Sequence, residues 1–133
     1  MLVDNQCSIY EHRPQACRTY DCRVFPAAGV EIDDDGKALI AQRARRWRFG
    51  FPTQADRNQH AAVRAAAKFL HDHADLLADV AEPANATQLA VLAIEIHDAF
   101  LRRDEDTGDT TVADPDAEVV RAEVTRRTRP RDP

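Results

Sequence analysis

All three cysteines of this 133-residue chain lie close to its start, as Cys7, Cys17 and Cys22, with the spacing Cys-x9-Cys-x4-Cys. Thiolates are soft ligands that suit zinc, copper(I) and iron–sulfur clusters. Free cysteine is also one of the most often buried residue types, so packing in a core is the alternative explanation. Because random cysteines seldom cluster this tightly, the spacing makes metal binding as good an interpretation as packing.

A metal site built from these cysteines lacks one ligand. A closed zinc site usually has four ligands in tetrahedral geometry, so three thiolates leave one position open. Candidates for that position are His12, Asp21, a more distant histidine or water. An iron–sulfur cluster with three protein thiolates and one open iron also fits the spacing. The spacing therefore leaves open both the metal and its fourth ligand.

The remaining histidines are poor partners for one another. His71 and His73 are two residues apart on a predicted helix, so they point to different sides. His60 and His71 are separated by about 16 Å along a helix axis, which excludes a shared metal ion. His97 lies in an apolar segment beside two carboxylates, and we interpret it as a histidine at the edge of the core.

The cysteine run "CSIYEHRPQACRTYDCRVF" carries a more specific pattern. It resembles the second half of the signature of a bacterial cysteine-cluster family described as putative zinc- or iron-chelating, or CxxCxxCC, proteins. In that family a CxxCxxCC group precedes a Cys-x-[IV]-Y-E-x-R-P-x-x-C-R-x-[FY]-x-C run. The residues that match the run are Cys7, Tyr10, Glu11, Arg13, Pro14, Cys17, Arg18, Tyr20 and Cys22.

The resemblance implies that the three cysteines bind zinc or iron, and it leaves the cellular role open. It is strong over residues 7–25, fair to about residue 52 and weak beyond. The CxxCxxCC group would precede residue 1, so we expect an N-terminally shortened form of the family. Arg13, Arg18 and Arg23 flank the thiols, where cations stabilise thiolates and offset the charge of a metal–thiolate site.

A second group of basic residues, "RARRWRF", interleaves arginine with aromatic rings, a pattern that suits RNA or anion binding. We favour the interpretation that these arginines form a solvated helix face whose charge is complementary to the acidic "EIDDD" upstream. The net charge of −5 argues against a general nucleic-acid-binding protein, which needs a basic field to neutralise phosphates. No phosphate-binding glycine loop or Ser/His/Asp set is recognisable.

Composition predicts one helical domain. Hydrophobic residues make up 44% of the chain and aromatic residues only 6%, while alanine is abundant. These values indicate helices packed through small side chains. No apolar stretch reaches the roughly 18 residues of a membrane span, and the start lacks a secretory pattern. We therefore expect a cytoplasmic protein with reduced thiols and no membrane partner.

The elements that would position the cysteines follow from periodicity and capping residues. Residues 30–32 alternate like a short strand, and a helix is predicted from about residue 36 to Gly50. Thr53 with Asp56 resembles a capping box for a long helix, with a break within residues 71–75. Asn85 or Thr87 caps the most apolar helix, predicted to extend to Arg103 at the centre of a bundle.

The predicted fold is mainly α: an irregular cysteine-rich knuckle packed on about three helices. Residues 1–103 form this cysteine-cluster domain. Residues 104–133 are charged and poor in large apolar groups, which predicts a loosely held tail, with a lone helix over 115–128.

Two functions from other classes remain open. A three-ligand site leaves room for water or substrate, as in a metal-dependent or redox enzyme. A metal-free helical interaction module is the other alternative.

Overall fold

The computed structural model describes residues 2–3, 6–7, 22–32, 38–81 and 85–128. The chain is mainly helical, as its composition predicted. The described helices are α2 (Val24–Ala28), α3 (Ala38–Ala44), α4 (Gln54–Asp72), α5 (Ala74–Leu77), α6 (Ala86–Ile96), the 3₁₀ helix η2 (His97–Phe100) and α7 (Ala117–Thr128). Four short strands form two antiparallel pairs, β1 (Leu2–Val3) with β2 (Gln6–Cys7) and β3 (Leu101–Arg103) with β4 (Thr110–Val112).

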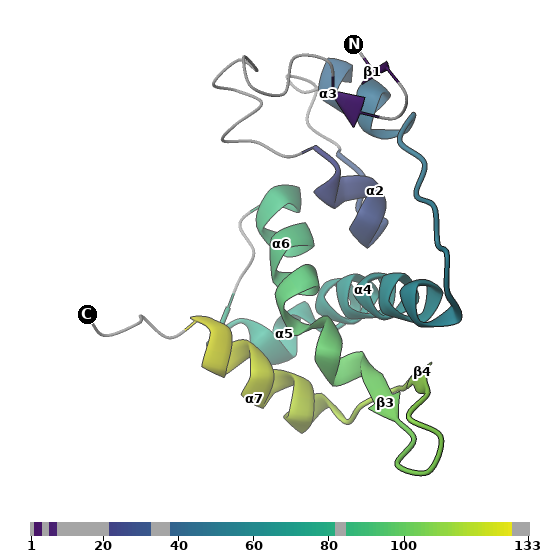
Figure 1. Cartoon of the computed structure of the whole chain (residues 1–133). Coiled ribbons are helices and arrows are strands. Elements are labelled where there is room, and N and C mark those ends of the chain that lie inside the picture. Colours follow the sequence, from purple (N-terminus) through teal and green to yellow (C-terminus); the bar gives the residue numbers. More distant parts are fainter. Residues whose placement is uncertain (1, 4–5, 8–21, 33–37, 82–84, 129–133) are drawn as a thin grey trace, which may run out of the picture.

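Helices α4 and α6 cross at the centre of the molecule, with α2 above them and α7 below (Figure 1). Their contact is made largely by alanines, which allow close approach of the two helix axes. The buried side chains of the pair are Ala62, Val63, Ala66, Ala67 and Leu70 on α4, and Ala90, Leu92, Ala93 and Ile96 on α6. Since α6 also packs on α2 and α7, its predicted central place is confirmed.

Both predicted helix starts are present. The Thr53 hydroxyl accepts from the Asp56 backbone N–H at 3.1 Å, and the Asp56 carboxylate accepts from the Thr53 N–H at 3.0 Å. The Asn85 side chain accepts from the Gln88 N–H at 3.0 Å. These bonds satisfy donors that a helix start leaves unpaired. The predicted break falls at His73, between α4 and α5.

Three predicted elements differ from the structure. The helix predicted from about residue 36 to Gly50 is present as α3, but it ends at Ala44. Residues 30–32 are not a strand, and Val30 instead packs against the helical core. The most apolar helix, predicted to extend to Arg103, ends at Ile96. The tighter η2 turn places Phe100 in the core at 2% exposure, and β3 then pairs with β4. Tertiary packing of one aromatic ring thus overrides the local helix preference.

The prediction of a loosely held tail is also wrong for the residues up to 128. Helix α7, predicted as 115–128, is present, but it is not alone. Val120 and Val124 lie one turn apart on α7 and are fully buried in the core. Arg121 donates to the Leu76 carbonyl at 2.6 Å and makes a bidentate pair with Asp79. Two well-placed valines and one arginine therefore attach a helix whose composition is mostly polar.

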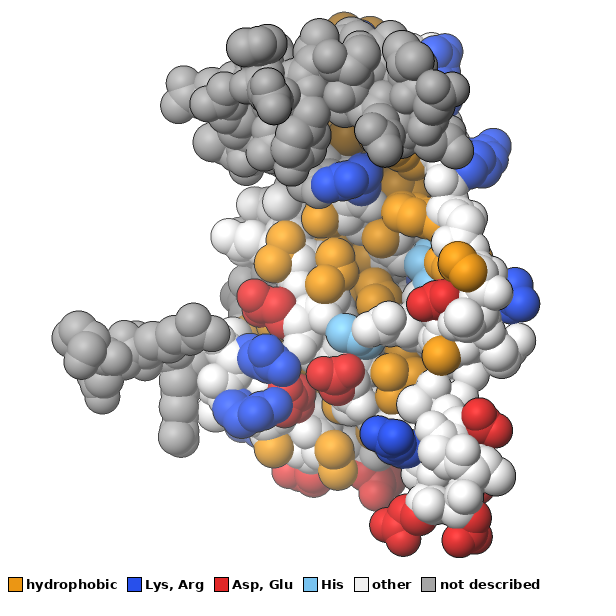
Figure 2. Space-filling model, in the orientation of Figure 1, with side chains coloured by type: hydrophobic (Ala, Val, Ile, Leu, Met, Phe, Trp, Pro, Cys, Tyr) orange, Lys and Arg blue, Asp and Glu red, His pale blue; other side chains and the backbone are white. Residues whose placement is uncertain are grey.

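The β3–β4 hairpin carries the acidic part of the same segment at the end of the molecule away from β1 (Figure 2). Its turn is closed locally: the Asp104 carboxylate accepts from the N–H groups of Asp106 and Thr107, both at 2.9 Å. These bonds hold the pKa of Asp104 below its ordinary value. No helix in the described parts of the chain is long and apolar enough to cross a membrane.

Candidate functional site

The predicted cysteine site lies only partly within the described residues. Cys22 occupies the turn before α2, half-buried, with a free thiol. The backbone of Cys7 is paired with that of Leu2 across the β1–β2 ladder. Cys17, His12 and Asp21 lie outside the described residues. The convergence of the three sulfurs and the predicted cysteine knuckle therefore stay predictions.

Two of the described histidines, His73 and His97, are held by contacts within the helical core or at its edge. His73 stacks on Phe69 with ring centroids 4.1 Å apart, and His97 is half-buried with its ring bonded to the Ile94 carbonyl and to Gln59. His97 is thus a histidine at the edge of the core, as predicted. Among the residues whose placement is described, no group of three or more His, Cys, Asp or Glu side chains is arranged to hold a metal ion.

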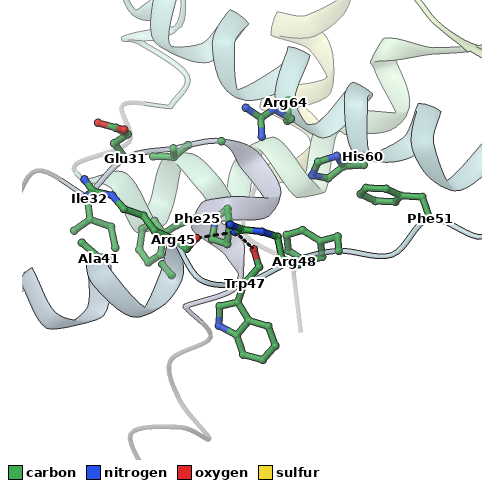
Figure 3. Close-up of a pocket in the computed structure, with 15 residues that line it drawn as sticks. Phe25, Glu31, Ile32, Ala41, Arg45, Trp47, Arg48, Phe51, His60 and Arg64 are labelled. Atoms are coloured by element: carbon green, nitrogen blue, oxygen red, sulfur yellow. Dashed lines mark hydrogen bonds between the residues drawn. The ribbon is translucent and has the colours of Figure 1, made fainter. Parts of the chain in front are cut away.

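A pocket of about 430 Å³ lies beside this N-terminal region, between α2, α3, the linker after α3 and the start of α4 (Figure 3). We call it the basic aromatic pocket. Its lining residues are Phe25, Pro26, Gly29, Val30, Glu31, Ile32, Ala41, Ala44, Arg45, Trp47, Arg48, Phe49, Phe51, His60 and Arg64. It gathers the "RARRWRF" run with residues that are distant in the sequence.

Helix α2 forms one wall of the pocket. Pro26 lies in the first turn of α2, where proline's missing N–H has no helical partner to lose. Gly29 ends the helix with φ of 68°, a left-handed conformation that favours glycine. The N–H of Val30 then donates to the Phe25 carbonyl at 3.0 Å. This tight end holds Phe25, only 1% exposed, against the pocket.

The linker between α3 and α4 is held by arginine side chains. Arg48 donates from Nη1 to the carbonyls of Arg45 and Trp47, at 2.9 and 3.1 Å (Figure 3). Arg57 donates to the Phe51 carbonyl at 3.1 Å. Carbonyls left over at the end of α3 thus gain charged donors. A guanidinium group has five N–H donors, so these two bonds do not exhaust the donors of Arg48.

Three rings form a cluster at the α4 side of the pocket. The Phe51 and Phe49 centroids lie 4.7 and 5.5 Å from that of His60. His60 Nε2 is buried and has no hydrogen-bond partner in the described structure. Burial lowers the pKa of His60, and the Arg64 charge lowers it further, while an interaction with the Pro26 backbone opposes the shift. The imidazole is therefore neutral at pH 7.

Arg64 reaches from α4 to the end of α2, where its guanidinium lies close to Gly29. A Cβ at residue 29 would lie 2.9 Å from Cζ and Nη2 of Arg64. Figure 3 shows His60 and Arg64 extending from the same helix toward α2, with Phe51 beside His60. Among the described lining residues, Arg45, Arg48 and Arg64 supply three guanidinium groups, and Glu31 supplies one carboxylate.

Fold and site define a small, mainly helical protein with a basic aromatic pocket and a half-buried thiol at the entry to α2. No protein-family model, curated protein or solved structure matches this chain. The resemblance to the cysteine-cluster family therefore depends on the residue pattern alone.

Proposed function

We propose that this chain is a metal-chelating protein of the cysteine-cluster type, in which Cys7, Cys17 and Cys22 bind zinc or iron. The single observation that carries the proposal is the run over residues 7–22, where all three cysteines keep the spacing and flanking residues of a chelating signature. Thiolates with this spacing suit zinc or an iron–sulfur cluster.

The surroundings of Cys22 support this proposal. Its thiol is free and half-buried, so it is neither used in a disulfide nor sealed in the core. Arg23, the next residue, lies with its guanidinium 5.9 Å from the Trp47 ring centroid, which links the turn that carries Cys22 to the linker after α3. The thiolate is the form of cysteine that binds metal. In the reducing cytosol, where we place the protein, such thiols stay available.

Metal content tests the proposal directly. The protein is purified without oxygen beside Cys17→Ser and Cys22→Ser variants, with Ser8→Ala as a matched control, and zinc and iron are measured by elemental analysis. We expect about one zinc ion or one iron cluster per chain for the wild type and control, and a large loss in both cysteine variants. Visible absorbance that bleaches on reduction would identify an iron–sulfur cluster, and His12→Ala would test the fourth ligand.

A wild-type protein that stays empty after loading with zinc and with iron would overturn the proposal. A second function would then stand, that of a metal-free helical interaction module. One observation favours it: the described core of Ala, Val, Leu, Ile and Phe contains no cysteine. Equal thermal stability of wild type and Cys17→Ala, with and without chelator, would support that module.

A further inference from the structure

The basic aromatic pocket has the size and lining of a site for a small ligand. Its volume of about 430 Å³ falls in the range that holds metabolite-sized molecules. Such sites combine apolar walls with a few convergent polar groups, and here aromatic rings alternate with guanidinium groups. Cys22 is not among the described residues that line it.

The charge of the lining favours an anion. Among the described lining residues, Arg45, Arg48 and Arg64 accompany a single carboxylate, that of Glu31, in a chain whose net charge is −5. The ion pairs recorded between described residues lie elsewhere: Lys68 with Asp72, His97 with Asp98, Arg121 with Asp79, and Glu123 with Arg126 and Arg127. The described part of the lining is thus positive, and guanidinium groups bind carboxylates and phosphates through paired hydrogen bonds.

The ring cluster favours a flat, unsaturated ligand body. The ring centroids of Phe49 and Phe51 lie 6.4 Å apart, and the two rings are stacked with an interplanar angle of 29°. Phe49 is 38% exposed. Together with His60 the two phenylalanines present ring faces and edges at the α4 end of the lining. Aromatic and guanidinium planes both stack on planar groups.

The Arg64 side chain is exposed and lies against the end of α2. Its guanidinium lies over Gly29, the one residue type that provides both the left-handed turn and the space for it. Figure 3 shows the Arg64 side chain extending from α4 toward α2. Arg64 thus brings a cation from another helix to the same pocket as the arginines of the linker.

We propose that the basic aromatic pocket binds a small planar anion, an aromatic ring that bears a carboxylate or a phosphate. The anion pairs with Arg45 and Arg64, and the ring lies against Phe49 and Phe51. A small molecule fits better than a nucleic-acid strand, because binding of a strand needs a longer basic track than one pocket on an acidic chain.

Calorimetric titration of the full-length protein with benzoate and with phenyl phosphate tests the proposal. Inorganic phosphate serves as a probe for the anionic group alone, and benzyl alcohol as a probe for the aromatic ring alone. We expect saturable binding of at least one aromatic anion, and an affinity lower by about tenfold or more for phosphate and for benzyl alcohol. Whichever anion binds more tightly identifies the headgroup. Fluorescence of Trp47, the only tryptophan of the chain, gives a second readout at the edge of the pocket.

Substitutions of two pocket arginines test whether the anion binds in the pocket. Arg64→Gln and Arg45→Gln should each weaken it by about tenfold, since each removes a charge-assisted hydrogen bond. Arg102→Gln, on an exposed position of β3 outside the pocket, should leave it unchanged. Circular dichroism and thermal melting confirm that the variants are folded.

Three results would overturn the proposal. The first is that neither aromatic anion binds; the second is that both pocket variants bind like the wild type. The third is that a ten-nucleotide oligothymidylate binds through Arg45 and Arg64 while the aromatic anions do not, which would assign the pocket to a nucleic-acid strand.

Discussion

The helical core and the α3 segment, residues 38–53, are stabilised by different kinds of interaction. The core, made by α4, α6, η2 and α7, is held by apolar side chains that lose nearly all contact with water. The α3 segment buries only Ala41 and Ala44 fully, and its backbone is held by arginine side chains that donate to carbonyl oxygens. Leu39, in α3, remains 76% exposed.

This difference explains where the pocket is. A densely packed core has no room for a ligand, because its side chains already fill the space between helices. The α3 segment meets α2 and α4 through aromatic and charged groups that leave a pocket between them. The charged and aromatic residues of the pocket thus lie where few side chains are buried, beside a helical core that does not depend on them for its packing.

Two phenylalanines give the largest contrast between the regions. Phe100→Ala should lower the free energy of unfolding by about 3–5 kcal/mol, since the ring is 2% exposed and its loss leaves a cavity. Phe49→Ala should cost only about 1 kcal/mol, because Phe49 is 38% exposed and makes mainly ring contacts. Urea denaturation measures both. Equal losses would show that the α3 segment is part of the cooperative core.

Helix α7 tests how far the core extends. Val124→Ala should lower the free energy of unfolding by about 2 kcal/mol, since the side chain is fully buried. Val119→Ala, at a position 52% exposed on the same helix, should change it by about 0.5 kcal/mol or less.

Limited trypsin digestion at Arg126 and Arg127 complements the denaturation measurement, with faster cleavage expected in Val124→Ala alone. A Val124→Ala protein as stable and as resistant as Val119→Ala would mean that α7 is not attached through its valines.

Sequence reasoning succeeded in the core because the signals there are local and redundant. The cap at Thr53 and the stripe that includes Val63, Ala67 and Leu70 each predict the same helix. The helix over 115–128 was predicted, but its packing on the core was not, because the segment is mostly polar in composition. Val120 and Val124 are few, but they lie on one face and meet a core that only the folded chain presents.

The pocket was missed for a different reason. The sequence run that supplies Arg45 and Arg48 was recognised as basic and aromatic, and interpreted as a solvated face. What makes it a pocket wall is the approach of Arg64 and His60, from another helix, over the turn at Gly29. A tertiary contact of that kind leaves no periodic signal, although the glycine that permits it is visible in the sequence.

The junction between the two regions depends on a local cap. Thr53→Ala should lower the free energy of unfolding by about 1 kcal/mol, because it leaves the Asp56 N–H without its acceptor. Thr53→Ser keeps the hydroxyl and should retain most of the stability. Thr111→Ala, on exposed β4, is the matched control. Amide hydrogen exchange at the first turn of α4 should quicken in Thr53→Ala alone; unchanged exchange would place the start of α4 under tertiary rather than local control.

The smallest expected effect is a pH dependence that originates in the pocket. In the folded chain the pKa of His60 lies below its ordinary value of 6.5, chiefly through burial and then through the Arg64 charge. As the pH falls through 6.5 the unfolded chain therefore binds a proton that the folded chain resists, and stability decreases until the pH passes the lowered folded pKa. Above that window His60 contributes no pH dependence.

Urea midpoints of wild type and His60→Gln, compared between about pH 7.5 and pH 5, isolate this contribution from that of the other histidines. Wild type should lose stability more steeply with acid than the variant. The carboxylates with lowered pKa, among them Asp56 and Asp79, do not interfere, because their stabilisation is lost only as the pH falls toward and below 3.8. Parallel pH profiles would mean that solvent reaches the His60 ring freely, and the aromatic cluster of the α3 segment would then be open in solution rather than packed against α4.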